Sequence, residues 1–535
     1  MLKFPSLTAL SVALLVIAPA TAQDSAVMSY GDSIGAVSVL EVRGIPAGLD
    51  GYLIPAMTTG GSPYLVSLSG DSNDMLTIDL GLAMAGTYFT GRIPNNGLWK
   101  VNVPLPNIPS YVDVRVYWQA FSRQNAAGAD MFQHFSPVRT MSMNTPDRWQ
   151  SSNNNGPAPS ANLSFCTAST GGRGGITEVF ISGGGPALLT DTSTPYPTIN
   201  RAWMYDCMSD THQLLPGAMT DGRAFHNSVK LQDGRFMVIG GIQGPYGSGN
   251  SYYSKVLNTC EIYDPATGTW TATATMSKYR AGSCSMVLPD GRVFVAGGTE
   301  GNNQHNVGDV ADLLTTSLKT SEIYNPATNS WSSGPNIQEP KAGATGLVLD
   351  DGRFALIGGI TFTTFLGIPI PDFSEKICVY DPVANSFNSQ ITMKDKRGLG
   401  CAAQLTNGQV YIAGGAGGDI LNIGPIKKTE VWNPANNSTT RKNDLSVGVA
   451  FSGCVAMENG SAIVIGGARG DLDDPIPVNN VWLFNPSNGS QTSLAAMPET
   501  HGGGVVSLLD DGTILVSGGE SNNGSATNAA ITYSP

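Results

Sequence analysis

The chain has 535 residues, of which 65 are glycine and only 13% are charged, and its formal net charge is -12. Lys, Glu and Arg are too scarce to solvate long helices, and the acidic balance argues against nucleic acid and anionic membranes as partners. The length exceeds what one hydrophobic core usually serves, so we expect two domains.

Residues 1–22 have the order of a signal peptide. Lys3 provides a positive start, an apolar run extends from Leu10 to Pro19, and the small residues Ala20-Thr21-Ala22 suit cleavage. The apolar run is too short to span a bilayer, and no later stretch reaches 18 unbroken apolar residues. We therefore expect a secreted, extracellular protein with no membrane insertion.

Residues 23–144 contain short apolar or alternating runs, such as 36–42, 64–68 and 112–118, which clusters of Gly, Pro and Asn separate. This pattern predicts a small β-sandwich-like domain. It carries no recognisable chemistry, so we expect a binding or spacer module.

A hydrophobic strand that ends in a glycine pair recurs seven times in the remaining chain. The second glycines of these pairs follow one another at intervals of 52 to 61 residues: Gly185, Gly241, Gly298, Gly359, Gly415, Gly467 and Gly519. In most copies a small-residue strand first leads into a tight Asp-Gly or Asn-Gly turn, such as Asp233-Gly234, which suits a two-residue hairpin and precedes the hydrophobic strand. A third strand ends in an aromatic residue before the next turn, as in Tyr263-Asp264-Pro265. Four short antiparallel strands per copy are typical of one propeller blade.

These motifs resemble the kelch repeat family. The resemblance covers about residues 145–535 and implies an all-β, seven-bladed β-propeller, but it says little about activity. The last repeat stops at its third strand, at Pro535. Residues 145–152 resemble Asn329-Ser330-Trp331-Ser332-Ser333, so we expect them to supply the missing fourth strand and close the ring. The alternative is that 145–160 is a linker.

The architecture also resembles galactose oxidase, a copper-radical enzyme on a kelch propeller. Phe165-Cys166 matches the cysteine that the family cross-links to a tyrosine, and Arg223-Ala224-Phe225-His226 matches the tyrosine strand. Phe225 replaces that tyrosine, no Tyr-His dipeptide occurs in the chain, and the domain that supplies the last histidine has no counterpart in this sequence. The resemblance therefore implies shared architecture without shared catalysis, and no cofactor is expected. Copper is expected only under the alternative hypothesis, that the chain is an oxidase relative with altered ligands.

Two histidines lie on predicted innermost strands, His226 in the second repeat and His501 in the seventh. They could bridge a metal ion, but two imidazoles without a third ligand make a weak site. We expect solvated or structural histidines, and no metal.

One set of basic residues occupies the same position in successive repeats, ten residues before the Asp or Asn of the tight turn. The set is Arg223, Arg280, Lys341, Arg397 and His501, with Val449 as a gap in the sixth repeat. Equivalent positions in a propeller lie on one ring around the axis. We expect these side chains either to bind an acidic ligand at the channel mouth or to brace neighbouring blades through hydrogen bonds.

The seven cysteines all lie in the repeat region: Cys166, Cys207, Cys260, Cys284, Cys378, Cys401 and Cys454. Their spacing does not match a zinc site, and their odd number leaves at least one unpaired. We expect mostly buried thiols, although an exported protein can form disulfides.

These patterns favour a non-catalytic recognition protein that binds a glycan or protein partner on one propeller face. A copper-radical oxidase relative with altered ligands is the second hypothesis, because the architecture supports it although the ligand set does not. A structural component of an extracellular matrix or surface is the third. Whether the protein is an enzyme stays open, with the non-enzymatic reading preferred.

Overall fold

The structure is a computed structural model of the whole chain. It describes residues 26–30, 37–43, 45–57, 88–94, 99–105, 110, 114–123, 132–133, 139–142, 147–151, 167–170, 178–185, 197–206, 211–248, 251–307, 312, 315–365, 368–388, 390–418, 423–457, 459–471, 475–509, 512–521, 527 and 529–535. The expected signal peptide lies outside these residues, as do Cys166 and Cys207.

The chain divides into two compact units. Unit 1 comprises residues 1–29, 37–104 and 113–143, and unit 2 comprises 30–36, 105–112 and 144–535. Unit 1 holds a sheet of β1 (Ala26–Tyr30), β2 (Val37–Arg43) and β5 (Trp99–Pro104). Its second sheet contains five strands, namely β4 (Phe89–Arg92), β3 (Asp50–Ala56), β6 (Arg115–Arg123), β7 (Phe132–Gln133) and β8 (Arg139–Ser142).

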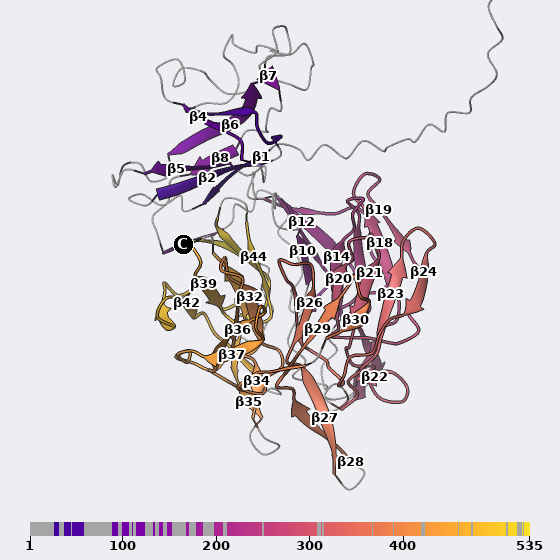
Figure 1. Cartoon of the computed structure of the whole chain (residues 1–535). Helices are drawn as coiled ribbons and strands as arrows, with labels where there is room; N and C mark the ends of the chain where they lie inside the picture. Colours follow the sequence, from indigo (N-terminus) through magenta and orange to yellow (C-terminus); the bar gives the residue numbers. More distant parts are fainter. Residues whose placement is uncertain are drawn as a thin grey trace, which may run out of the picture. The chain divides into compact units, whose positions relative to one another are not determined.

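Within its described residues, unit 2 contains seven antiparallel sheets of at least four strands, here called sheets 1 to 7 in chain order (Figure 1). Sheet 1 is β10 (Thr167–Thr170), β11 (Glu178–Ser182), β12 (Ala202–Asp206) and β13 (Thr211–Leu214). Sheet 2 is β14 (Asn227–Lys230), β15 (Phe236–Ile239), β18 (Cys260–Asp264) and β19 (Thr269–Ala272). Sheet 3 is β20 (Cys284–Val287), β21 (Val293–Ala296), β23 (Ser321–Asn325) and β24 (Ser330–Ser333). Sheet 4 is β25 (Thr345–Val348), β26 (Phe354–Ile357), β29 (Lys376–Asp381) and β30 (Ser386–Phe387), with β31 (Ile391–Thr392) also on β29.

The last three sheets repeat this order. Sheet 5 is β32 (Cys401–Gln404), β33 (Val410–Ala413), β36 (Thr429–Asn433) and β37 (Ser438–Arg441). Sheet 6 is β38 (Gly453–Ala456), β39 (Ala462–Ile465), β42 (Val481–Asn485) and β43 (Ser490–Ser493). Sheet 7 is β44 (Val505–Leu508), β45 (Ile514–Ser517), β46 (Ala530–Ser534) and, from far earlier in the chain, β9 (Arg148–Ser151). Within the described residues, the expectation of an all-β chain built from repeated four-stranded antiparallel sheets is therefore confirmed.

The turn between the first and second strands follows directly from its sequence. Gly234 has a φ of 87°, a conformation that glycine adopts without strain. The Asp233 carboxylate accepts hydrogen bonds from the backbone N–H of Arg235 at 3.1 Å and from its guanidinium at 2.7 Å. The same Asp-Gly-Arg turn recurs in sheets 3 and 4. These contacts lower the pKa of the turn aspartates, with the side-chain bond to arginine as the largest cause.

The core of unit 2 lies between neighbouring sheets. The second strands of sheets 2 to 7 are buried along their whole length because both of their faces pack on another sheet. Stacked aromatic rings join neighbouring sheets. The ring centroids of Phe180 and Phe236 lie 4.4 Å apart between sheets 1 and 2, and those of Phe294 and Tyr380 lie 3.9 Å apart between sheets 3 and 4. Burial of these side chains stabilises each sheet only in the presence of its neighbour.

The first strands of the seven sheets lie next to one another in succession, from β10 to β44, and β44 in turn contacts β10. The fourth strand of sheet 7 is β9, which precedes every strand of sheets 1 to 6 in the chain. It pairs with β46 and places Trp149 opposite Tyr533. The two ends of the segment 144–535 of unit 2 thus meet in one sheet.

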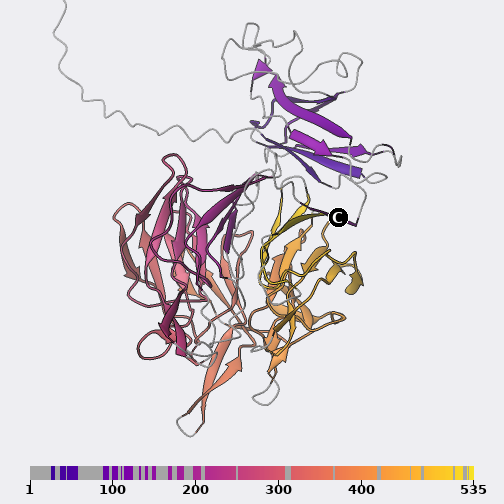
Figure 2. The ribbon, with the colours of Figure 1, turned by 180° about the vertical axis from the view of Figure 1, so that it is seen from behind.

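Extra hairpins follow the second strand in several sheets. They are β16 (Ile242–Ser248) with β17 (Ser251–Val256), β27 (Ile360–Phe365) with β28 (Ile368–Phe373), β34 (Ala416–Gly417) with β35 (Gly424–Pro425), and β40 (Ala468–Gly470) with β41 (Pro475–Pro477). The orange hairpin β27–β28 projects from the same edge of unit 2 in both views (Figures 1 and 2). The opposite edge of the sheets is formed by short turns such as the Asp-Gly-Arg turns.

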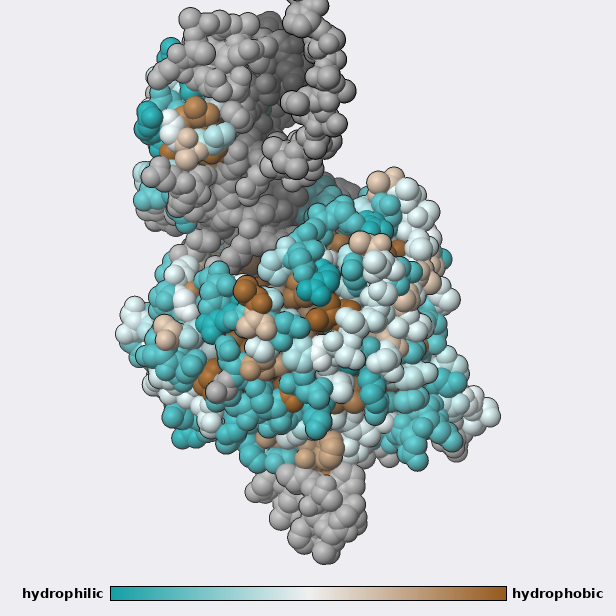
Figure 3. All heavy atoms as spheres, turned by 45° about the vertical axis from the view of Figure 1, so that its right-hand side comes forward, coloured by the Kyte–Doolittle hydropathy of each residue, from teal (hydrophilic) through white to brown (hydrophobic). Residues whose placement is uncertain are grey.

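On the face that Figure 3 shows, the described residues are mostly hydrophilic, with hydrophobic residues in scattered spots. Few large hydrophobic side chains among the described residues are exposed, Val383 most of all. In the same part of the chain there is no helix that is long and apolar enough to cross a membrane.

The contacts of Trp149 yield the first prediction. Trp149 donates from Nε1 to the Ala495 carbonyl at 2.8 Å, and Trp331 in sheet 3 makes the same contact with Ala274 at 2.8 Å. The preceding Asp147 and Asn329 also match, since each has a positive φ and accepts a hydrogen bond from the nearby tyrosine hydroxyl. We expect Trp149→Ala and Trp331→Ala to lower the free energy of unfolding equally, by about 2–3 kcal/mol, because both rings are half-buried. Urea unfolding followed by fluorescence measures this. A linker at 148–151 would instead leave Trp149→Ala within about 0.5 kcal/mol of the parent.

Candidate functional site

The five side chains predicted to form a cationic ring lie inside the sheets. Their exposed fractions are 0% for Arg223 and Arg280, 1% for Lys341 and Arg397, and 3% for His501. Each donates a hydrogen bond to the carbonyl of the first glycine of the pair in its own sheet. The acceptors are Gly240, Gly297, Gly358, Gly414 and Gly518, at 2.6 to 2.8 Å. We call these five side chains, with Val449 at the sixth position, the brace residues.

Three arginine brace residues also have a buried carboxylate partner on the third strand. Arg223 reaches Glu261 at 2.9 Å, Arg280 reaches Glu322 at 3.0 Å, and Arg397 reaches Glu430 at 2.9 Å. Each glutamate also accepts from a backbone N–H of the loop that leads to the arginine, at 2.7 to 2.9 Å. Burial lowers the pKa of Arg280, and Glu322 opposes this effect. The buried charge is thus balanced within one sheet.

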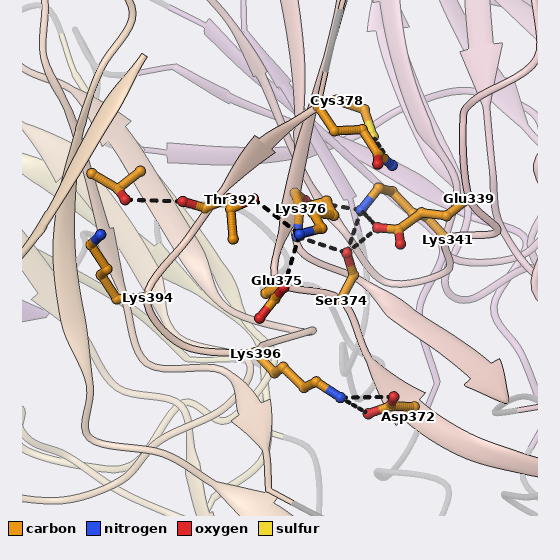
Figure 4. Close-up of polar contacts among 12 residues, drawn as sticks. Glu339, Lys341, Asp372, Ser374, Glu375, Lys376, Cys378, Thr392, Lys394 and Lys396 are labelled. Atoms are coloured by element: carbon orange, nitrogen blue, oxygen red, sulfur yellow. Dashed lines mark hydrogen bonds and ion pairs between the residues drawn. The ribbon is translucent and has the colours of Figure 1, made fainter.

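In sheet 4 the buried charge of Lys341 is balanced by different partners (Figure 4). The position of the glutamate is occupied there by Cys378. Lys341 Nζ instead lies 2.7 Å from the Glu339 carboxylate and 2.8 Å from the Ser374 hydroxyl, and it donates to the Lys376 carbonyl at 3.0 Å. Ser374 donates in turn to Glu339.

The backbone of the brace residue links its sheet to the one before it. The carbonyl of Arg280 accepts from the N–H of Gly241 at 2.8 Å, and the carbonyl of Arg397 accepts from Gly359 at 2.8 Å. A Cβ atom at Gly240 would lie 2.3 Å from the Arg280 carbonyl oxygen, so no side chain fits there. The glycine pair is therefore required because the next sheet's brace residue approaches it so closely.

Sheets 6 and 7 show that the brace residue and its partner change together. In sheet 6 the brace position is Val449 and the glutamate position is Trp482, and both side chains pack in one hydrophobic cluster. In sheet 7 the brace residue is His501 and the partner position is Ile531. Where the carboxylate is absent, no arginine is present, which avoids an unpaired buried charge.

The expectation that the brace residues bind a ligand at the channel mouth stays a prediction. In this structure the five side chains are buried, and each donates to an internal glycine carbonyl. The alternative expectation, that they brace the sheets through hydrogen bonds, describes what they do. The spacing in the sequence predicted that the brace residues occupy equivalent positions in successive sheets. It did not predict that their side chains are buried inside the sheets.

His226 and His501, considered as a metal pair, each have an internal partner. His226 Nε2 lies 2.9 Å from the Ser182 hydroxyl, and His501 Nδ1 lies 2.6 Å from the Gly518 carbonyl. Both rings are buried. Among the described residues there is no group of three or more His, Cys, Asp or Glu side chains placed to hold a metal ion.

A second feature, which sequence reasoning missed, lies two residues after each brace position. Six residues there share a positive φ of 52° to 66°: Phe225, Gly282, Gly343, Leu399, Phe451 and Gly503. Backbone hydrogen bonds of 2.8 to 2.9 Å connect the first five in succession, from Gly282 N to Phe225 O and onward to Phe451 N and Leu399 O. We call these six residues the belt. Three of them are large apolar residues, for which this conformation costs about 1–2 kcal/mol each.

Partly exposed aromatic side chains lie on the apolar cluster of Phe225 and on the hairpin β16–β17 that contributes to it. Phe225 and Tyr279 pack on the same apolar cluster, which includes Ile242 and Val256 of the hairpin β16–β17. Tyr279 stacks on His305 with ring centroids 3.8 Å apart, and Tyr246 stacks on Tyr253 at 5.8 Å. β17 pairs with β22 (Asn306–Val307), which holds His305 next to the hairpin. We call Phe225, Tyr246, Tyr253, Tyr279 and His305 the aromatic patch.

The aromatic patch is tied to the brace of sheet 2. Asp221 lies 3.8 Å from Arg223 and accepts from the Thr259 hydroxyl at 2.6 Å. Gln243 donates to Asp221 at 3.3 Å, and the Tyr246 hydroxyl donates to Gln243 at 2.5 Å. Burial, with the charge of Asp221 and the neighbouring Tyr253, raises the pKa of Tyr246. Lys255 Nζ lies 4.5 Å from the Tyr246 ring centre, so a cation also faces the patch.

Comparison with known proteins agrees with this architecture. The model of the Kelch motif matches residues 229–277 and 280–338. Similar curated proteins include the spermatocyte protein spe-26 of Caenorhabditis elegans, 23% identical over 44% of this chain and 37% of that protein. The kelch-like protein terF of Aspergillus terreus is 23% identical over 54% of this chain and 58% of its own length, and human kelch-like protein 23 is 25% identical over 53% and 42%. The chain thus spans between about two fifths and three fifths of the length of these relatives.

Solved structures show a similar fold. A fungal alcohol oxidase of the AA5 family, in complex with copper, superposes with a TM-score of 0.50 at 16% identity, over 72% of this chain and 76% of that one. At this identity the likeness concerns the fold alone. YjhT is also similar, with a TM-score of 0.45 and 19% identity over 63% of this chain and 99% of its own.

The brace generates the second prediction. Arg280→Met leaves Glu322 buried without its cation, so we expect the free energy of unfolding to fall by about 3–5 kcal/mol. Adding Glu322→Gln removes the stranded charge and should recover part of that loss. The matched control is Arg292→Met, whose pair with Asp290 is largely exposed and should change stability by less than about 1 kcal/mol. Urea unfolding of the three variants and the parent decides this, and equal losses for Arg280→Met and Arg292→Met would contradict the brace.

The buried histidines yield a prediction about pH. Burial, and secondarily Arg223, lowers the pKa of His226 well below 6.5, and burial lowers that of His501. Below pH 6.5 the unfolded chain therefore binds protons that the folded chain does not, so stability falls as pH falls from 6.5. The limit is about 1.4 kcal/mol per pH unit for each histidine. The turn aspartates do not titrate in this window, because their pKa is lowered. Thermal midpoints between pH 7.5 and 5 should drop less steeply for His226→Gln than for the parent; equal slopes would show that His226 does not contribute.

Proposed function

We propose that this chain, which is a kelch-repeat β-propeller protein, is a secreted, non-catalytic recognition protein that binds a glycan or protein partner on one face of the ring. The observation that carries the proposal is the aromatic patch. Its side chains are partly exposed, and two of them, Phe225 and His305, have positive φ values of 52° and 60°. Strain of this kind is kept in proteins mainly where a side chain must take a particular direction.

The finer architecture forms part of the proposal. Seven sheets, whose first strands contact in a closed succession, support a seven-bladed ring in which β9 completes the last blade. The two sheets of unit 1 support a small β-sandwich-like N-terminal domain. The sequence of residues 1–22 supports secretion.

The aromatic patch suits a ligand with both apolar and polar faces. Tyrosine rings offer flat apolar surface together with a hydroxyl, and they lose little conformational freedom on binding. The CH faces of a sugar ring, or an aliphatic side chain of a partner, can lie on such rings while their polar groups reach Lys255. The hairpin β16–β17 and β22 hold these side chains on paired backbone, which limits the cost of ordering them.

The second candidate is an oxidase, because the fungal alcohol oxidase with bound copper shares the fold. Phe225 lacks the hydroxyl that a tyrosine would offer to a metal, and Cys166 lies outside the described residues. Copper loading followed by oxygen consumption on primary alcohols and aldehydes discriminates the two candidates. Copper-dependent turnover would overturn the recognition proposal. A purely structural matrix or surface component is the third candidate and would show no saturable ligand.

Phe225→Gly tests the proposed binding face. Glycine removes the ring and the left-handed strain together, so the thermal midpoint should change little, because relief of about 1–2 kcal/mol offsets the lost apolar contact. Affinity for a ligand found on a glycan array should fall tenfold or more, as measured by titration calorimetry.

Leu399→Gly is the matched control, since Leu399 holds the same belt position away from the aromatic patch. It should keep the affinity within about twofold of the parent. Unchanged affinity in Phe225→Gly, or an equal loss in both variants, would place the binding site elsewhere.

A further inference from the structure

Two thiols face each other across the boundary between sheets 5 and 6. Cys401 begins β32, the first strand of sheet 5, and Cys454 lies on β38, the first strand of sheet 6. The two strands are in contact. Cys401 is buried in a hydrophobic cluster, and Cys454 is partly buried and packs against the same cluster. The Ser452 hydroxyl, two residues before Cys454, lies 3.4 Å from Cys401 Sγ.

The repeat shows how close these positions are. Cys401 is the fourth residue after the brace residue of its sheet, and Cys454 is the fifth after that of the next sheet. Between sheets 3 and 4 the same two positions hold Cys284 and Gly346. A Cβ atom at Gly346 would lie 3.1 Å from Cys284 Cβ and 3.3 Å from its Sγ. Disulfides join residues whose Cβ atoms are about 3.5–4.5 Å apart, so the two positions are within disulfide reach.

We propose that Cys401 and Cys454 form a redox-sensitive pair that closes into a disulfide and links sheet 5 to sheet 6. With hydrogen peroxide as oxidant, the Cys401 sulfur attacks one peroxide oxygen, the O–O bond breaks, and a sulfenic acid and one water result. The Cys454 sulfur then attacks the Cys401 sulfur, the S–S bond forms, and the sulfenic oxygen leaves with the Cys454 proton as a second water. Two thiols and one peroxide thus give one disulfide and two waters.

The surroundings of the pair assign the two roles. Cys454 donates a hydrogen bond to the Cys401 sulfur, which lowers the pKa of Cys401 and raises that of Cys454. Cys401 is therefore the attacking thiolate and Cys454 the resolving thiol. Burial raises the pKa of Cys260 and Cys284 to about 12, so these thiols stay protonated and inert.

The position of Cys401 and Cys454 at the boundary of sheet 6 also suits a disulfide that links this sheet to sheet 5. Sheet 6 has Val449 at the brace position, so it lacks the buried arginine and glutamate pair that sheets 2, 3 and 5 contain. Val449 and Cys401 belong to the same hydrophobic cluster. A disulfide at this point would add a covalent link beside a sheet whose brace position is apolar.

Peptide mapping of the full-length protein tests the proposal. The chain is incubated with graded hydrogen peroxide, its free thiols are blocked with N-ethylmaleimide under denaturing conditions, and it is digested with trypsin without reductant. Cys401 and Cys454 fall on separate peptides, 398–427 and 443–469, each with a single cysteine. We expect a joined peptide with a mass two hydrogens below the sum, which separates on reduction.

Cys401→Ser and Cys454→Ser should each abolish the joined peptide. The matched control, Cys284→Ser, removes the thiol at the equivalent position of sheet 3 and should leave the joined peptide as in the parent. The proposal is overturned if both peptides stay labelled by maleimide at every peroxide dose, if Cys401 proceeds to sulfinic acid instead, or if either cysteine pairs with a third. Since the mapping of the parent decides this, the result does not depend on the folding of any variant.

Discussion

The structure of unit 2 depends on one contact, the hydrogen bond from a buried side chain to the carbonyl of the first glycine of a pair. This contact fixes the end of the second strand against the start of the first strand in the same sheet. The backbone carbonyl of the same residue binds the glycine pair of the preceding sheet. One residue therefore holds two sheets in register, and its repetition links successive sheets of only four short strands.

The chemistry of this contact varies while its geometry stays constant. Arg with Glu, Lys with Glu and Ser, and neutral His all reach the same glycine carbonyl, whereas Val449 replaces the polar contact by packing. Buried ion pairs contribute little net stability compared with apolar side chains of similar volume, so a Val–Trp pair is an adequate substitute. A buried cation without its carboxylate, or the carboxylate without its cation, would destabilise the sheet because an unpaired buried charge would remain.

The repeat architecture could be predicted from the sequence because its signals are local. Asp-Gly turns, glycine pairs and the aromatic residue that ends the third strand each determine a backbone feature within a few residues. The sequence left two roles open for the brace residues, ligand binding and bracing, and it could not decide between them because burial depends on the neighbouring sheets. One signal did exist: Glu261, Glu322 and Glu430 each stand two residues before an aromatic residue, in the sheets whose brace residue is arginine. The aromatic patch was not predicted because it depends on contacts between residues that are far apart in the sequence, such as Phe225 and His305.

The belt separates what the scaffold requires from what a side chain adds. Every position in it needs a positive φ, and glycine meets that need without strain at Gly282, Gly343 and Gly503. Phe225, Leu399 and Phe451 accept the strain at equivalent positions, so their side chains must contribute something that glycine would not. At Phe225 this coincides with the aromatic patch. The brace Arg223 connects to that patch through Asp221, Gln243 and Tyr246, and Arg223 and Arg280 are both paired with glutamate. The sheets that carry the proposed binding surface are thus held by paired braces, which keeps the surface in its binding geometry before a ligand arrives.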